Sequence, residues 1–161
     1  MNMSYMFGEC TNLNTLDVSG FDTSKVTNMY MMFQNCIKLT NLDVSQNVNL
    51  TELNASGNQL TNLDLSGFDT ARVLNMSNMF RNCSAITELD LSKFDTEGVT
   101  NMSKMFSGCT SIEHLDLSSF KTPELTDING MFMDCRKLKH VNINNLITDK
   151  VIDMSDVFNN C

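Results

Sequence analysis

The chain has 161 residues, 42% of them hydrophobic, and carries a formal net charge of −8. This length suits one domain with a sizeable core. No stretch approaches the roughly 20 apolar residues of a membrane span, so we expect no membrane insertion. The acidic balance argues against binding nucleic acid or an anionic membrane, since both require basic patches.

One five-residue pattern recurs along the chain, and each copy ends in a cysteine. The copies read MFGEC, MFQNC, MFRNC, MFSGC, MFMDC and VFNNC. They contain all the cysteines of the chain: Cys10, Cys36, Cys83, Cys109, Cys135 and Cys161. The cysteines follow a 26-residue period, except that the interval from Cys36 to Cys83 holds an additional, 21-residue unit. Such a period is typical of a repeat architecture.

Each 26-residue unit carries two apolar clusters in chain order, as residues 84–109 illustrate. In the front cluster, Leu89 and Leu91 alternate with polar residues, which predicts a short strand. The spacing of the back cluster, Val99 to Cys109, predicts a short strand that runs into a tight turn or 3₁₀ segment. One unit cannot bury its own apolar face, whereas a stack of such coils can. We therefore expect a right-handed repeat solenoid of about six coils, about 30 Å long, as a single domain over residues 1–161.

The segment 37–83 indicates the class of solenoid. It holds one further 26-residue coil and the shorter, 21-residue coil. Residues 50–60 read LTELNASGNQL, the leucine-rich-repeat pattern with Ala55 at its third apolar position. The sequence therefore predicts a leucine-rich-repeat-like β-solenoid with short parallel strands.

The repeated pattern MFxxCxxLxxLDLSxFDTSxVTNM resembles the 26-residue repeat of bacterial surface proteins and lipoproteins of the Listeria and Mycoplasma type, which are related to BspA-like leucine-rich repeats. The resemblance covers essentially the whole chain. It implies an extracellular or cell-surface location and a role in adhesion or host interaction, and it implies no catalytic residue. Because the lipobox or sorting signal usual in that family is absent, we expect the chain to be part of a longer repeat protein.

Stacking would place the six cysteines in one column. A disulfide framework, a metal site, reactive thiols and a buried structural ladder are the alternatives. Equivalent residues of neighbouring coils lie about 5 Å apart, but their Cβ vectors run parallel, which suits a disulfide poorly. The chain also lacks the C-x-x-C pair of a zinc site. The spacing favours a ladder of buried thiols that pack as small hydrophobic groups.

Two further polar columns are predicted to be structural. We expect the asparagine column to hydrogen-bond the backbone of adjacent coils, and the threonine column to cap the opposite corner. The first column is Asn2, Asn28, Asn75 and Asn101, continued by Asp127 and Asp153; the second is Thr23, Thr70, Thr96, Thr122 and Thr148.

An acidic stripe forms a column that should face outward: Asp17, Asp43, Asp64, Asp90 and Asp116. Like charges about 5 Å apart repel each other, so the stripe requires compensation. It could bind a cation such as calcium, or a partner. Alternatively, each aspartate accepts hydrogen bonds from a neighbouring serine or backbone N–H. The loop motif of an EF-hand is absent.

The outward position before the central leucine differs from coil to coil. In repeat proteins the constant positions build the scaffold, whereas variable outward positions form the binding surface. Both histidines of the chain occupy this position in adjacent coils, where metal binding or pH sensing is an alternative role. The predicted contact surface is Glu88, Glu113, His114, Lys139 and His140.

No nucleophile-elbow, zincin or P-loop motif is present, so the sequence predicts no enzyme, cofactor or metal site. The favoured function is a protein-binding or adhesion scaffold, or a rigid spacer, whose partner is a protein or a host-surface component. Uncapped solenoid ends suggest a second possibility, a structural protein that assembles head to tail. Calcium-dependent binding on the acidic stripe is a more distant alternative.

Overall fold

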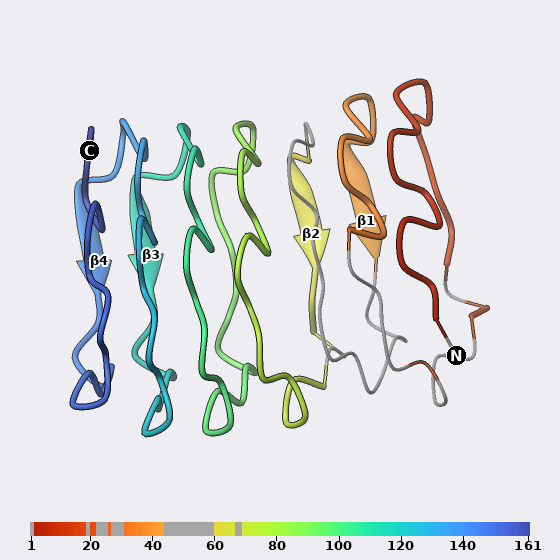
Figure 1. Cartoon of the computed structure of the whole chain (residues 1–161). Helices are drawn as coiled ribbons and strands as arrows, with labels where there is room; N and C mark the ends of the chain where they lie inside the picture. Colours follow the sequence, from red (N-terminus) through yellow and green to blue (C-terminus); the bar gives the residue numbers. More distant parts are fainter. Residues whose placement is uncertain (1, 19, 22–25, 27–30, 44–59, 67–68) are drawn as a thin grey trace.

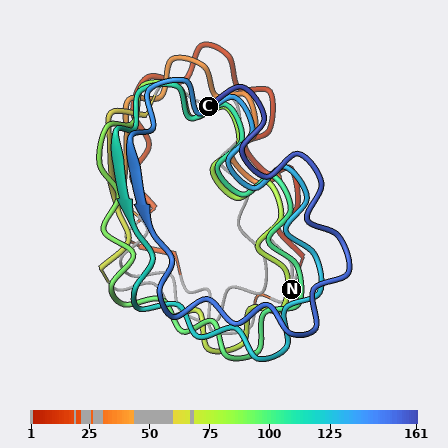
Figure 2. The same cartoon turned by 90° about the vertical axis from the view of Figure 1, so that its left-hand side faces the viewer.

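The computed structural model describes residues 2–18, 20–21, 26, 31–43, 60–66 and 69–161. The chain runs as coils that lie side by side along one axis, with its first and last coils at opposite ends (Figure 1). Seen along that axis, the coils overlie one another around a common outline (Figure 2). Strands lie on one side of this outline, here called the front, and tight turns lie on the other side, the back.

Four short strands form two parallel pairs on the front. Strand β1 (Asn41–Asp43) pairs with β2 (Asn62–Asp64), and β3 (His114–Asp116) pairs with β4 (His140–Asn142). The first register spans the short, 21-residue coil and the second spans a 26-residue coil, so the pairing follows both intervals of the repeat. In β3 the central Leu115 is 3% exposed while both neighbours are exposed, as the alternation predicts.

The strand predicted in residues 84–109 is not found. Residues 86–91 form no strand, and no backbone hydrogen bond between described residues joins Glu88–Asp90 to the coil on either side. Most of the leucine-rich pattern at 50–60, Ala55 included, lies outside the described residues. The stacking is that of a repeat protein, while the right-handed, leucine-rich-repeat-like class and the number of coils stay predictions.

The back of each described coil is a run of turns, which confirms the predicted tight turn, while the predicted short strand is reduced to a single bridge residue and no 3₁₀ segment is found among the described residues. Backbone N–H groups alternate between two kinds of acceptor, as residues 78–83 illustrate. Asn78, Phe80 and Asn82 donate to carbonyls of the next coil, at 2.7–2.9 Å. The residues between and after them donate to carbonyls of the preceding turn, within the same coil. Every N–H group of this run is therefore satisfied.

This alternation requires two left-handed residues in every described back segment. In successive coils the first of them is Asn78 (φ 59°), Lys104 (φ 55°) and Gly130 (φ 58°). The second is Asn82 (φ 59°), Gly108 (φ 75°) and Asp134 (φ 60°). Glycine and asparagine tolerate this conformation, whereas a lysine is strained in it.

Columns of aromatic rings fill the core. Phe80, Phe106 and Phe132 are buried and stack in sequence, with ring centroids 5.6 and 5.7 Å apart. Phe94 and Phe120 form a second stack at 6.2 Å. Because each ring contacts its equivalents in the neighbouring coils, the core is continuous along the stack.

The two polar columns act differently from one another. Asn75, Asn101 and Asp127 each accept the N–H of the residue two positions later, at 2.8 Å, so they cap their own coil rather than the backbone of the adjacent one. At this column the coils are linked by backbone bridges between equivalent residues, and the Asn101 amide adds a side-chain hydrogen bond to Asp127 at 3.2 Å. The threonine hydroxyls do reach the next coil, and Asn28 and Thr23 lie outside the described residues.

Candidate functional site

A shallow groove of about 400 Å³ crosses the front of the C-terminal half. The register of β3 with β4 sets His114 beside His140 and Asp116 beside Asn142, which gives two rows of outward side chains. Glu88 extends the histidine row into the preceding coil. The lining is Glu88, Leu89, His114, Leu115, Asp116, His140 and Asn142.

The structure brings the predicted contact surface together. Glu88, His114 and His140 line the groove, while Glu113 and Lys139 each directly precede one of the histidines. Lys139 Nζ donates to Glu113 Oε2 at 2.6 Å and joins two coils. This hydrogen bond and the lysine charge lower the pKa of Glu113.

Four lining residues were absent from the predicted contact surface. Asp116 belongs to the predicted acidic stripe, while no binding role is predicted for Leu89, Leu115 and Asn142. Asn142 carried a usable signal, because it stands where the aspartate column changes to an amide. For Leu89 the alternation predicts an inward side chain, whereas it is only half-buried beside the groove.

Hydrogen bonds within the adjacent turns offset the repulsion between the aspartates of the acidic stripe. Asp64, Asp90 and Asp116 are exposed, and each accepts the backbone N–H of the serine two positions later at 2.9–3.0 Å. Hydrogen bonds from these serines lower the pKa of all three carboxyl groups. This is the hydrogen-bonded alternative considered above. Asp17 is exposed, and the side chain of Asp43 lies outside the described part.

The described side chains do not form a set of metal ligands. Over the described ranges, no group of three or more histidine, cysteine, aspartate or glutamate side chains is placed to hold a metal ion. His114 and His140 lie side by side on neighbouring strands, and metal binding by this pair stays a prediction. Calcium binding by the stripe stays a prediction.

The cysteine column is a ladder of thiols. Four of the six are buried, Cys10 is half-buried and Cys161 is exposed. Cys109 and Cys135 donate their S–H groups to the carbonyls of Phe80 and Phe106 in the preceding coil, at 3.1 Å. Burial raises the pKa of Cys109 well above its ordinary value and that of Cys135 to about 12. These thiols are therefore protonated and poorly nucleophilic at neutral pH.

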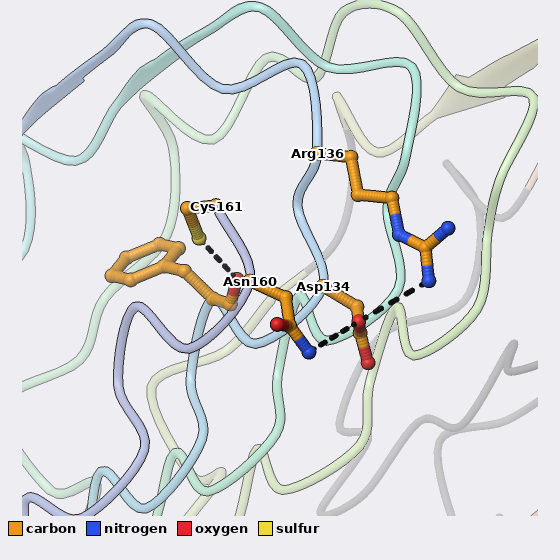
Figure 3. Close-up of polar contacts among 5 residues, drawn as sticks. Asp134, Arg136, Asn160 and Cys161 are labelled. Atoms are coloured by element: carbon orange, nitrogen blue, oxygen red, sulfur yellow. Dashed lines mark hydrogen bonds and ion pairs between the residues drawn. The ribbon is translucent and has the colours of Figure 1, made fainter.

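Polar side chains at the position before a cysteine pair with those of the neighbouring coil at two places, one of which is drawn in Figure 3. Asn160 Nδ2 donates to Asp134 Oδ1 of the preceding coil at 3.2 Å, beside the Cys161 thiol. Arg136 lies 3.5 Å from the same carboxylate oxygen. At the other end of the stack, Asn35 donates to Glu9 at 2.8 Å. An amide therefore pairs with a carboxylate of the preceding coil at two places in this column.

Comparison with known proteins places the chain in a family. Within the described ranges, no helix has the length and apolar character needed to cross a membrane. No curated protein and no solved structure matches the chain. A family model matches residues 1–62 and residues 48–161, which together cover the whole chain. The chain therefore belongs to the family described as Mycoplasma protein of unknown function, DUF285.

Proposed function

We propose that this protein is a non-enzymatic cell-surface module that binds a protein partner through the groove on β3 and β4. The observation that carries the proposal is the placement of the outward residues that vary between coils. Three of them, Glu88, His114 and His140, line one groove, whereas the phenylalanine, cysteine and threonine columns are engaged in holding the coils together. Variable side chains on a regular scaffold are what repeat proteins use for recognition.

The chemistry of the groove suits an extended segment with a basic group. His114 and His140 can each donate and accept hydrogen bonds, and Asn142 adds an amide. Glu88 and Asp116 supply negative charge along the same groove, and Leu89 offers a partly apolar surface between the rows. The net charge of −8 would also speed association with a basic partner.

The proposed location and role draw on the repeat itself. Its resemblance to the 26-residue repeats of Listeria- and Mycoplasma-type surface proteins, related to BspA-like leucine-rich repeats, supports an extracellular or cell-surface site and a part in adhesion. On this proposal the stack is a right-handed leucine-rich-repeat-like solenoid. A rigid spacer is the alternative supported by the continuous core, and it would require no ligand in the groove.

The test is binding of the fluorescently labelled chain to cultured epithelial cells. We expect saturable binding that is lost when surface proteins are removed with trypsin. The variant Glu88→Ala/His114→Ala/His140→Ala should weaken binding at least tenfold. The control Glu124→Ala/Lys150→Ala removes an exposed ion pair between the same two coils as Glu113 and Lys139. It should leave binding unchanged.

Three outcomes decide between the alternatives. Binding that survives the groove variant would place recognition elsewhere on the surface. An absence of binding to trypsin-sensitive proteins would favour the spacer. Binding that disappears in EGTA would favour the calcium-dependent alternative, and binding unaffected by EGTA would remove it.

A further inference from the structure

The backbone ladder on the front is interrupted in the coil 84–109. Strands β2 and β4 each pair with the strand of the preceding coil. The equivalent residues Glu88–Asp90 make no backbone hydrogen bond with the described residues of either neighbouring coil. Leu89 is half-buried, whereas its equivalent Leu115 is buried. In the described part, the front of this coil therefore departs from the pattern of the repeat.

The interruption leaves one edge of β3 open. The carbonyl of Glu113 and the N–H of Leu117 bond to β4 at 3.3 and 2.9 Å. Successive residues of a strand direct their backbone groups to opposite edges, so those of His114 and Asp116 face the coil 84–109. Among the described residues, no backbone group of that coil pairs with them. Strand β3 therefore presents unpaired N–H and C=O groups within the stack.

Contacts on both sides of the interruption hold the two coils together. Thr110 Oγ1 donates to the Ser84 carbonyl at 3.5 Å, and Ser119 Oγ donates to the Leu91 carbonyl at 3.1 Å. On the back, N–H groups of the coil 84–109 donate to carbonyls of the next coil at 2.7–2.9 Å. The open edge is therefore framed by bonded segments, and its geometry is set before a ligand arrives.

The groove of about 400 Å³ lies along this open edge. Leu89 and Leu115 belong to its lining although the alternation directs both inward, so the groove extends between the coil 84–109 and β3. Glu88 and Asp116 place carboxylates along the same groove. A chain lying there would meet unpaired backbone groups at one edge and negative charge beside them.

We propose that β3 binds an extended segment of the partner protein as an added strand at its open edge. The N–H and C=O groups of His114 and Asp116 then pair with the backbone of that segment, which completes the interrupted ladder. A basic side chain of the segment lies against Glu88 or Asp116. This mode of binding rests on the function proposed above, and it makes the extended backbone of the partner the principal feature that is recognised.

Hydrogen exchange of the free chain, followed by NMR, tests whether the edge is open. The protection factors of the His114 and Asp116 N–H groups should be at least tenfold lower than that of Leu117, which bonds to β4. Equal protection of the three amides would show that residues 88–90 close onto β3 in solution, and it would overturn the proposal.

The probe for binding is the peptide acetyl-Thr-Lys-Val-Lys-Val-Thr-amide, which is basic and favours an extended conformation. Binding should slow exchange of the His114 and Asp116 amides at least tenfold and leave Leu117 unchanged. N-methylation of both lysines blocks one edge of the extended peptide, and N-methylation of both valines blocks the other. One methylated peptide should lose binding at least tenfold while the other keeps it. Equal effects, or no binding at about 1 mM, would overturn the proposal.

A matched pair of substitutions tests the charge of the segment. Asp116→Asn keeps the turn, as Asn142 does at 3.3 Å, and should weaken peptide binding roughly threefold. Asp64→Asn makes the same change in another coil and should leave binding unchanged. Equal effects of the two substitutions would overturn the assignment of a basic segment.

The proposed function and the added strand can fail separately. Peptide binding that protects the edge amides, without binding of the chain to cells, would contradict the function and leave the added strand standing. Binding to cells that the groove variant abolishes, while the peptide protects neither edge amide, would support the function and overturn the added strand.

Discussion

The hydroxyl group of Thr96 makes two hydrogen bonds with the backbone of Lys121 in the next coil. Thr96 Oγ1 donates to the Lys121 carbonyl at 3.0 Å and accepts the Lys121 N–H at 3.0 Å. The threonine is 1% exposed. One buried side chain therefore satisfies both polar groups of a backbone residue in the next coil, which neither coil could satisfy within itself.

Substitutions of Thr96 should distinguish the contribution of its hydrogen bonds to stability from the contribution of its packing. Thr96→Val keeps the shape but leaves the Lys121 N–H and carbonyl without their partner, so we expect a loss of about 1–3 kcal/mol in the free energy of unfolding. Thr96→Ser keeps the hydroxyl and should lose less. Urea unfolding measures both. A loss for Thr96→Ser as large as that for Thr96→Val would show that packing of the methyl group contributes as much as the two hydrogen bonds.

Substitutions at the first left-handed position of a back segment should change stability in opposite directions, depending on which residue is there. Lys104 (φ 55°) is strained, so Lys104→Gly should stabilise the chain by about 0.5–1 kcal/mol. Gly130 (φ 58°) is its equivalent in the next coil, and Gly130→Ala should destabilise the chain by a similar amount. Melting temperatures compared side by side check the signs. Destabilisation by Lys104→Gly would show that the lysine side chain contributes more than its strain costs.

The thiol ladder predicts a dependence on burial. Cys109 and Cys161 make the same contact with a phenylalanine carbonyl, at 3.1 and 3.0 Å, but only Cys109 is buried. Cys109→Ala should cost about 1–2 kcal/mol, while Cys161→Ala should cost less than about 0.5 kcal/mol. Chemical unfolding measures both costs, and similar values would contradict a ladder stabilised by burial.

We expect the exposed cysteine to be alkylated before the buried ones. Burial raises the pKa of Cys109 and Cys135, so the folded chain disfavours their thiolates. With iodoacetamide at pH 8, Cys161 should be modified before either of them, and peptide mass spectrometry identifies the sites. Because the folded pKa lies above the unfolded value of about 8.5, the associated stability is complete below that pH and is lost as the pH rises.

The aspartate turns predict acid sensitivity. The folded pKa of Asp116 is lowered by hydrogen bonds from Ser118, so its contribution to stability is present above the unfolded value of about 3.9 and falls away as the pH drops through the folded value. Asp116→Asn removes this titration but keeps the turn, as Asn142 does in the next coil at 3.3 Å. Urea unfolding at pH 7, 4 and 3 should give a shallower decline for the variant. Parallel declines would exclude this carboxylate as a cause.

The front of the molecule could be predicted because it depends on period alone. The two-residue alternation along a strand determines which side chains face outward, and the 26-residue period places His114 beside His140. The predicted contact residues therefore came together. Alternation does not determine the depth of a groove, so the exposure of Leu89 beside it required the side-chain packing.

The back could not be predicted in the same way. Its turns depend on left-handed residues, and composition signals such residues only where glycine or asparagine occupies the position. Lys104 and Met31 adopt this conformation because the neighbouring coils impose the hydrogen-bond pattern. The hydrogen-bond partners of the asparagine column differ from the prediction for a related reason, since the turn brings an N–H donor of the same coil to the side-chain oxygen.

The ladder along the back also gives the stack an electrical polarity. In the turns that follow the asparagine column, the inter-coil N–H groups donate toward the following coil, as those of Phe80, Phe106 and Phe132 do, whereas those of Thr100, Thr126 and Ile152 donate toward the preceding coil. The peptide dipoles of the turns therefore add along the stack instead of cancelling as they do in an ordinary sheet. The side of each turn that faces the following coil bears partial positive charge and the opposite side bears partial negative charge, so an anion is favoured on the first side and a cation on the second.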